Sequence, residues 1–294
     1  MAFKIQLPAK CILGGEYTIL NKGIGIVCPF YKYHLTLEYQ PDTMQTCHTI
    51  TGEAFNSIQI IMWGVIVSAL NALGKNPRDL KGHFVIDCTI PPCSGLGFSA
   101  ALCAAVCEWL ISANLLARKE LLPFAQRLED SFHLKSSGID LIGVMAKKMV
   151  SYSSERTVSE IALGWKPQLY VSNSGQRSIT RDCMEHINAQ RATSPEKIAR
   201  IEEQMMAATF LIKEALESDT EDRLALLAKG LNLANECYYA WGLVSNKLND
   251  HLTEVKQYAL ACKIIGAGFG GHVLSLWKET PPSSLPFKLY PLLS

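Results

Sequence analysis

Alternating apolar and polar positions mark the start of the chain as β-structure. The stretch "FKIQLPAKCILGG" begins with this alternation, and "IGIVCPF" and "YHLTLEY" continue it. Turns are expected at Gly14–Gly15 and at residues 21–23, where glycine and asparagine interrupt the pattern. The N-terminal region is therefore predicted to be rich in strands.

A long apolar segment, residues 56–74, then predicts a helix. Its apolar residues surround nearly the whole helix, which is typical of a helix buried in a core. Gln59, Ser68 and Asn71 interrupt the segment, so it is a poor candidate for a membrane span. A strand in "GHFVIDCTI", helices over about 99–113 and 118–132, and a strand in "KKMVSYS" are expected to follow.

Helical periodicity dominates the second half of the chain. After a strand in "KPQLYVSNSG", three helices are expected in "SPEKIARIEEQMMAATFLIKEALE", "TEDRLALLAKGLNLANECYYAWGL" and "NDHLTEVKQYALA". "CKIIGAGFGGHVLSLW" reads as a strand, a glycine turn and a strand. The pattern changes near 160–166, so we predict an α+β protein with domains at 1–163 and 164–294 and mostly antiparallel strands.

Composition agrees with a two-domain globular protein. The chain has 294 residues, of which 48% are hydrophobic and 19% charged, and its net charge is +1. Such a balance gives no global attraction to nucleic acid or to a membrane. The ten cysteines form no C-x-x-C pair, and the N-terminus lacks the apolar core of a signal peptide. We therefore expect a cytoplasmic protein with reduced thiols.

Cys103 and Cys107 lie four residues apart and should share one helix face. They could bind a metal ion, but no histidine or cysteine partner stands at a finger-like spacing. Burial as small apolar side chains is the expected alternative.

The stretch "PPCSGLGFSAA" (residues 91–101) has the composition of an anion-binding loop. A strand is expected to end before it, Gly95 and Gly97 allow close approach of the backbone, and a helix should begin near Ser99. Free N–H groups at a helix N-terminus bind phosphate. An ordinary strand–turn–helix joint is the alternative, because the loop has neither the Walker pattern nor a dinucleotide fingerprint.

Two further stretches change the interpretation of this loop. "LPAKCILGGEY" places Lys10 and Glu16 around a Gly–Gly turn, and "IIGAGFGG" (residues 264–271) is a second glycine loop. Alone, each is weak evidence. In this order, the three blocks resemble the motifs of the GHMP kinases, named for galactokinase, homoserine, mevalonate and phosphomevalonate kinases. The resemblance spans Pro8 to Gly271.

That resemblance implies a fold and an activity. The fold would have a ribosomal-protein-S5-like N-terminal domain and a ferredoxin-like C-terminal domain, with the active site in the cleft between them. The activity would be transfer of a phosphoryl group from ATP, with Mg²⁺, to a small-molecule alcohol. A homodimer is possible, and neither nucleic acid nor membrane is expected as a partner.

The resemblance also implies roles for particular residues. Asp140 would accept the proton of the substrate alcohol, and Lys10 would keep it ionised. Glu129, eleven residues before Asp140, would hold Mg²⁺ with Ser99. ATP would bind the loop residues Pro92, Cys93, Ser94, Gly95, Leu96, Gly97, Phe98, Ser99 and Ala100. The substrate alcohol would contact Lys10, Glu16, Tyr17, His133, Asp140, Thr180 and Gly268.

Within the family, "LEDSFHLKSSGID", "SNSGQRSIT" and "GLVSNKL" resemble segments of mevalonate kinases. This similarity implies that the primary alcohol of mevalonate is the acceptor, early in isoprenoid synthesis. A phosphomevalonate kinase, another small-alcohol or sugar kinase, and a non-catalytic binding protein on the same fold are the alternatives.

Three positions depart from the family pattern. Cys93 stands where glycine is usual, and we expect the phosphate cradle to survive there if the local φ is negative. Phe98 replaces the first of two serines and adds bulk. Tyr17 occupies a position where mevalonate kinases more often have histidine and phosphomevalonate kinases often have tyrosine.

Overall fold

The structure is a computed structural model that describes residues 2–21, 23–42, 46–51, 55–131 and 136–293. The chain forms two compact units. Unit 1 comprises residues 1–9, 31–92 and 97–145, and unit 2 comprises residues 10–30, 93–96 and 146–294. The domain boundary expected at 163/164 stays a prediction.

Two long strands contribute residues to both units. They are β1 (Phe3–Gly14) and β2 (Ile24–Pro41), which pair with each other. Their N-terminal place in the chain confirms the strands expected from the alternating pattern. The 3₁₀ helix η1 (Ile19–Asn21) lies between them, close to the turns predicted around glycine.

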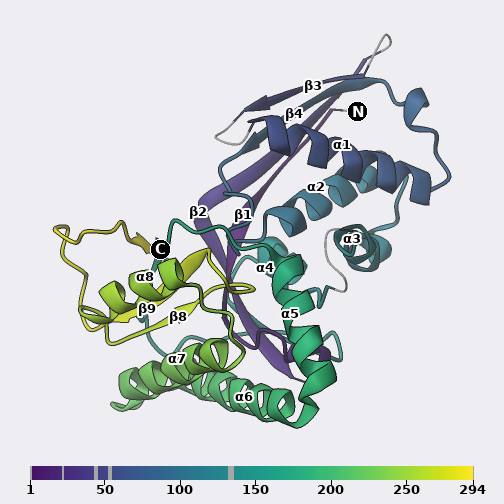
Figure 1. Cartoon of the computed structure of the whole chain (residues 1–294). Helices are drawn as coiled ribbons and strands as arrows, with labels where there is room; N and C mark the ends of the chain where they lie inside the picture. Colours follow the sequence, from purple (N-terminus) through teal and green to yellow (C-terminus); the bar gives the residue numbers. More distant parts are fainter. Residues whose placement is uncertain (1, 22, 43–45, 52–54, 132–135, 294) are drawn as a thin grey trace. The chain divides into compact units, whose positions relative to one another are not determined.

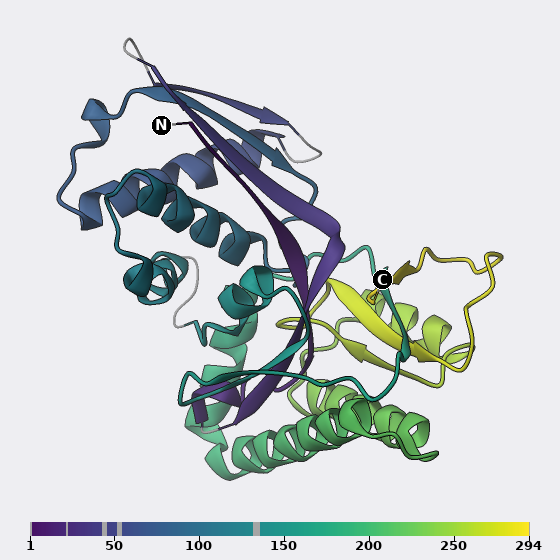
Figure 2. The same ribbon diagram turned by 180° about the vertical axis from the view of Figure 1, so that it is seen from behind.

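Unit 1 is a sheet with helices on one side. β4 (Gly82–Cys88) pairs antiparallel with β2 and parallel with β3 (Thr46–Thr51). Parallel neighbours need a long crossover, and α1 (Phe55–Ala72) supplies it between β3 and β4. Both ribbon views show α1 and α2 (Phe98–Ser112) along the same face of the sheet (Figures 1 and 2).

Helix α2 is the centre of unit 1. It packs against α1, α3 (Leu121–Glu129) and α4 (Ile139–Met145). Its Trp109 meets Phe84 of β4 edge to face, with ring centroids 5.1 Å apart. Cys103 and Cys107 are buried in this helix with free thiols, as expected for small apolar side chains.

Unit 2 contains a four-stranded antiparallel sheet in the order β10–β7–β9–β8. The strands are β7 (Gln168–Asn173), β8 (Ala261–Ile264), β9 (His272–Trp277) and β10 (Tyr290–Pro291). Two more strands, β5 (Val150–Ser153) and β6 (Val158–Glu160), continue from β2.

The helices of unit 2 are α5 (Thr180–Thr193), α6 (Pro195–Glu217), α7 (Arg223–Ala240) and α8 (Asn246–Lys256). α6 packs along α7, and α7 and α8 both contact β8 (Figure 1). Strands and helices are thus mixed, and the predicted α+β class is confirmed.

Three local features differ from the expectations. The segment 118–132 begins as a 3₁₀ turn, η3 (Arg118–Glu120), and its helix α3 ends at Glu129. A further 3₁₀ turn, η2 (Pro77–Asp79), precedes β4. Helices α4 and α5 were not predicted, because α4 has only seven residues, too few to show a helical period, and α5 is strongly polar with two buried residues.

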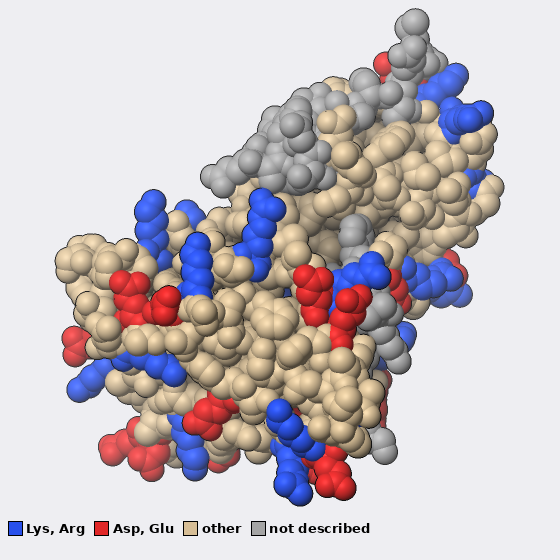
Figure 3. Space-filling view, viewed as in Figure 1, with Lys and Arg blue, Asp and Glu red and all other residues tan. Residues whose placement is uncertain are grey.

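Charge and hydropathy add two observations. On the face drawn in Figure 3, positive and negative side chains are interspersed, in keeping with the net charge of +1. Among the described residues, none of the helices combines the length and the apolar character that crossing a membrane requires.

Candidate active site

The first glycine loop (residues 91–101) has a backbone of alternating handedness. Cys93, Gly95 and Gly97 have φ angles of 54°, 78° and 82°, whereas the two residues between them are not in the positive region. Successive residues of opposite handedness turn their N–H groups toward one side and form a concave anion-binding nest. Residues 93–97 are therefore shaped to hold phosphate oxygens.

The conformation of Cys93 corrects one expectation. We expected the cradle to survive at Cys93 if φ were negative, but φ is positive and belongs to the nest itself. A left-handed backbone costs an L-residue about 1–2 kcal/mol. Cys93 therefore keeps the conformation of the usual glycine at an energetic cost, and its thiol is exposed.

Helix α2 begins directly after the nest. Gly97 is its N-cap and offers no side-chain cap, so backbone N–H groups are presented at the N-terminus of this helix. Phe98 is the first residue of the helix and is buried, which makes it part of the core of unit 1. The positive end of the helix dipole adds to the attraction for an anion.

The second glycine loop (residues 266–271) packs against residues 93–96 inside unit 2. A Cβ atom on Gly95 would lie 2.6 Å from the carbonyl oxygen of Ile265, and one on Gly271 would lie 2.6 Å from that of Ser94. Such distances exclude any side chain. Both glycines are therefore required by the close approach of the two loops, which a sequence pattern alone left ambiguous.

Hydrogen bonds fix residues 93–96 in the same unit. The Ser178 N–H donates to the Cys93 carbonyl at 2.7 Å, and the His272 Nδ1 lies 3.0 Å from the Ser94 carbonyl. Because a carbonyl only accepts, Nδ1 carries the proton. Burial lowers the pKa of His272, which keeps the imidazole neutral.

Lys10 lies beside the nest. Its backbone N–H donates to the Leu96 carbonyl at 3.0 Å, and its side chain is buried within unit 2. The lysine of the first motif and the first glycine loop are thus neighbours, although 83 residues separate Lys10 from Cys93.

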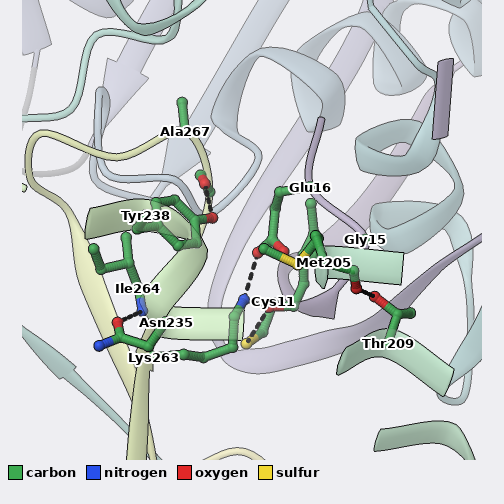
Figure 4. A network of polar contacts seen from close by, with 12 residues as sticks. Cys11, Gly15, Glu16, Met205, Thr209, Asn235, Tyr238, Lys263, Ile264 and Ala267 are labelled. Carbon is green, nitrogen blue, oxygen red and sulfur yellow. Dashed lines mark hydrogen bonds and ion pairs between the residues drawn. The ribbon is translucent and has the colours of Figure 1, made fainter. Parts of the chain in front are cut away.

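Glu16 forms a buried ion pair behind the second glycine loop. The Lys263 Nζ lies 2.5 Å from Glu16 Oε1 and donates to the Ile12 carbonyl at 3.1 Å (Figure 4). Neither side chain is exposed to solvent beyond a few per cent. The carboxylate of Glu16 is therefore engaged with Lys263, and a contact with substrate stays a prediction.

Tyr17 also contacts the second glycine loop. Its hydroxyl donates to the Ala267 carbonyl at 2.5 Å, and its ring meets Trp241 edge to face at 5.0 Å. The residue has a φ of 67° and lies two positions after Gly15. The predicted substrate residue Gly268 is the next residue of that loop, and Thr180 begins helix α5 in the same unit.

The remaining predicted residues lie in unit 1. Glu129 is 1% exposed at the end of α3, and its carboxylate helps to raise the pKa of Cys103, for which burial is the main cause. Glu129 therefore faces α2 near Cys103. Ser99 lies four residues before Cys103, on the same face of that helix.

Asp140 stands in the first turn of α4. Gly138, with a φ of 85°, turns the chain into this helix, and the Oδ1 atom of Asp140 is buried. A carboxylate in a first turn is favoured by the helix dipole. His133, the other candidate of this segment, lies outside the described residues.

A metal site built from protein side chains alone is absent from the part of the chain that the structure describes, since no three histidine, cysteine or acidic residues gather there. The predicted metal ligands Glu129 and Ser99 would supply two oxygen donors. That set fits Mg²⁺, which takes one or two protein ligands and completes its shell with water and phosphate.

Sequence reasoning missed several residues that shape the site. They are Ser178, Tyr238, Lys263 and His272. Lys263 and His272 flank the second glycine loop, which could have drawn attention to them. Tyr238 lies 28 residues before Gly266, and only the packing of α7 on β8 brings the two together.

Comparisons with known proteins agree with these motifs. Residues 61–147 match the family model for the GHMP kinases N terminal domain. A mevalonate kinase from Aeropyrum pernix is 27% identical over 295 residues, which cover 95% of this chain and 89% of that protein. The sequence similarity therefore extends over nearly the whole chain.

Solved structures show the same fold. Mevalonate kinase from L. major, in complex with R-mevalonate, superposes with a TM-score of 0.74 at 20% identity and covers 94% of this chain and 87% of its own. Galactokinase from Lactococcus lactis, complexed with galactose, gives 0.75 at 16% identity, covering 94% and 85%. The chain therefore matches the GHMP kinase N-terminal domain over residues 61–147 and shares the fold of these kinases over most of its length.

Proposed function

We propose that this protein transfers a phosphoryl group from ATP to the primary alcohol of mevalonate. The observation that carries the proposal is the nest at residues 93–97, which continues into the uncapped N-terminus of α2. Backbone N–H groups at such a place bind the phosphates of a nucleotide without sequence-specific side chains. The curated relative from Aeropyrum pernix supports mevalonate as the acceptor.

Asp140 is proposed as the general base. Phosphoryl transfer needs a residue that receives or orients the proton of the attacking hydroxyl, and a carboxylate serves this purpose. Asp140 is ordered by its place in the first turn of α4. The short helix holds the carboxylate in a fixed direction, which favours catalysis by positioning.

Lys10 is proposed to neutralise charge on the phosphates. Its backbone is hydrogen-bonded to Leu96 of the nest, which supports a role beside the nucleotide. An ammonium group stabilises the charge that spreads over the equatorial oxygens during transfer. Both Lys10 and the nest would then act on the same part of ATP.

Glu129 and Ser99 are proposed to hold Mg²⁺. The metal would neutralise the outer phosphates of the nucleotide when it is bound. The buried position of Glu129 facing α2 and the shared helix face of Ser99 and Cys103 support this pair.

Phosphomevalonate is the second candidate acceptor. Tyr17, rather than histidine, favours it, because the resemblance to phosphomevalonate kinases includes a tyrosine there. The TM-scores do not separate the acceptors, since a galactokinase and a mevalonate kinase superpose equally well. Turnover measured with each candidate alcohol is therefore needed to identify the acceptor.

A coupled assay of ADP release tests the proposal. Purified protein is mixed with MgATP and, separately, with mevalonate, phosphomevalonate and galactose. We expect mevalonate to give a kcat/KM at least about a hundredfold above the other two, the discrimination that buried polar contacts allow. Faster turnover of phosphomevalonate would favour the second candidate, and no turnover with any alcohol would favour a non-catalytic protein.

A further inference from the structure

Two tyrosine hydroxyls hold consecutive carbonyls of the second glycine loop. Tyr238, on α7, donates to the Gly266 carbonyl at 2.5 Å. Tyr17, after β1, donates to the Ala267 carbonyl at 2.5 Å. All four residues belong to unit 2. Two segments that are more than 200 residues apart in the sequence therefore form hydrogen bonds to neighbouring peptides of one loop.

A third hydroxyl continues the series. Ser178, just before α5, donates to the Gly268 carbonyl at 2.6 Å, and the Cys183 thiol approaches the same oxygen at 3.5 Å. Three carbonyls in succession thus accept a side-chain hydroxyl, each from a different segment of unit 2. A glycine-rich loop without such partners would sample many conformations, because glycine restricts the backbone least.

The three hydroxyls also determine where the loop N–H groups point. In a trans peptide, the C=O and the following N–H point in opposite directions. Fixing the carbonyls of residues 266–268 therefore fixes the N–H groups of residues 267–269 on the other side. That of Phe269 donates to the Leu243 carbonyl at 2.6 Å, as this geometry requires.

The surroundings make the two tyrosines rigid. Tyr238 is fully buried, and Trp241 packs edge to face against both rings, at 5.0 Å from Tyr17 and 5.8 Å from Tyr238. The Lys263 Nζ lies 5.7 Å from the centre of the Tyr238 ring and is held by its ion pair with Glu16 (Figure 4). Burial raises the pKa of both phenols, so both hydroxyls remain donors at neutral pH.

We propose that Tyr17, Tyr238 and Ser178 are positioning residues, which hold residues 266–268 in the single conformation that phosphoryl transfer requires. The inference rests on the proposed kinase activity. It gives the Tyr17 hydroxyl the role of holding the second glycine loop in place. Preorganised peptide dipoles act mainly on the charge that develops in the transition state, so these hydroxyls should affect kcat more than substrate binding.

Hydrogen–deuterium exchange of the substrate-free protein tests the anchoring directly. In Tyr17→Phe and Tyr238→Phe, the amides of residues 265–272 should exchange about tenfold faster than in the wild type, because each variant loses one hydrogen bond to the loop. Tyr239→Phe is the matched control. Its hydroxyl lies on the same helix but donates to Asn249 Oδ1 at 2.8 Å, away from the loop. Equal exchange rates in the wild type, the two loop variants and the Tyr239→Phe control would overturn the proposal.

Steady-state kinetics test the catalytic consequence. Tyr17→Phe and Tyr238→Phe should each lower kcat about tenfold and leave the KM for ATP within about threefold, whereas Tyr239→Phe should keep the wild-type kcat. Ser178→Ala should behave alike, and Ser178→Thr, which keeps the hydroxyl, should recover most of the rate. A purely structural role would instead give wild-type kcat in every folded variant, which contradicts the proposal.

The two tests separate two kinds of failure. A wild type that phosphorylates no alcohol would refute the proposed function, and the exchange experiment would still decide whether the hydroxyls hold the loop. An active wild type with unchanged exchange and unchanged kcat in the variants would refute the positioning role alone.

Discussion

Cys93 combines an exposed thiol with a strained backbone at the centre of the proposed phosphate nest. Eight other cysteines, all those whose burial is described, are buried, so a maleimide should react at Cys93 first. Bound ATP should cover this thiol. We expect ATP at ten times its Kd to slow alkylation about tenfold, in proportion to the free protein that remains.

Mass spectrometry of the labelled protein measures this protection. Cys93→Ser is the control and should lose the rapid adduct. Alkylation of Cys93 at the same rate with and without ATP would mean that the nucleotide does not bind at residues 93–97.

Asp140→Asn tests the assignment of the general base. The substitution keeps the shape of the side chain but removes its ability to accept a proton, so kcat should fall about a hundred- to ten-thousandfold. The KM for ATP should change little. Rapid-quench or coupled kinetics give both values, and a loss of less than about tenfold in a folded variant would assign the carboxylate an orienting role only.

Sequence reasoning worked at the residue scale where a residue belongs to a local motif. Gly95, Gly97 and Lys10 could be singled out because they stand within short patterns. The positive φ of Cys93 could not, since an L-residue such as cysteine normally avoids that region.

Two elements of unit 2 carry buried histidines that make stability depend on pH. His251 on α8 shares a hydrogen bond with Ser172 of β7 at 2.8 Å, and His272 begins β9. Burial lowers the pKa of both below the ordinary 6.5, although Glu254 opposes the shift of His251. His251 also disfavours protonation of His272 by repulsion.

The free energy of unfolding should therefore fall as the pH drops below 6.5. The unfolded chain takes up protons that the folded state binds only at lower pH, so stability is retained above 6.5 and lost below it. Each histidine contributes a slope of up to about 1.4 kcal/mol per pH unit. Urea unfolding between pH 5.5 and 8 measures this, with His251→Gln expected to reduce the slope. A flat profile in the wild type would contradict it.

The elements themselves were predictable to different degrees. The long helices α6 and α7 and the strands around the second glycine loop follow from strong periodicity. The short helix α4 does not, because its seven residues are determined by the glycine turn before it and by packing against α2. The parallel pairing of β3 with β4 likewise depends on the α1 crossover.

At the scale of the whole molecule, nucleotide and metal should stabilise the protein together. A ligand at a hundred times its Kd adds about 2.7 kcal/mol to the free energy of unfolding. MgATP should therefore raise the Tm by several degrees, and ATP with EDTA should raise it less. In Glu129→Gln the difference between the two conditions should shrink, because one anionic ligand of Mg²⁺ becomes neutral.

Differential scanning calorimetry measures these shifts. Glu108→Gln, at an acidic position on α2, serves as a control and should keep the wild-type difference. An undiminished effect of Mg²⁺ in Glu129→Gln would show that Glu129 is not a ligand of the metal.

The central claim is that mevalonate receives a phosphoryl group, and ³¹P NMR of the reaction mixture tests it most directly. With protein, MgATP and mevalonate, we expect a new phosphomonoester signal that grows in step with ADP and without free phosphate. The signal should be absent when mevalonate is omitted. A mixture in which ATP persists, or in which ADP appears only with inorganic phosphate, would contradict the account.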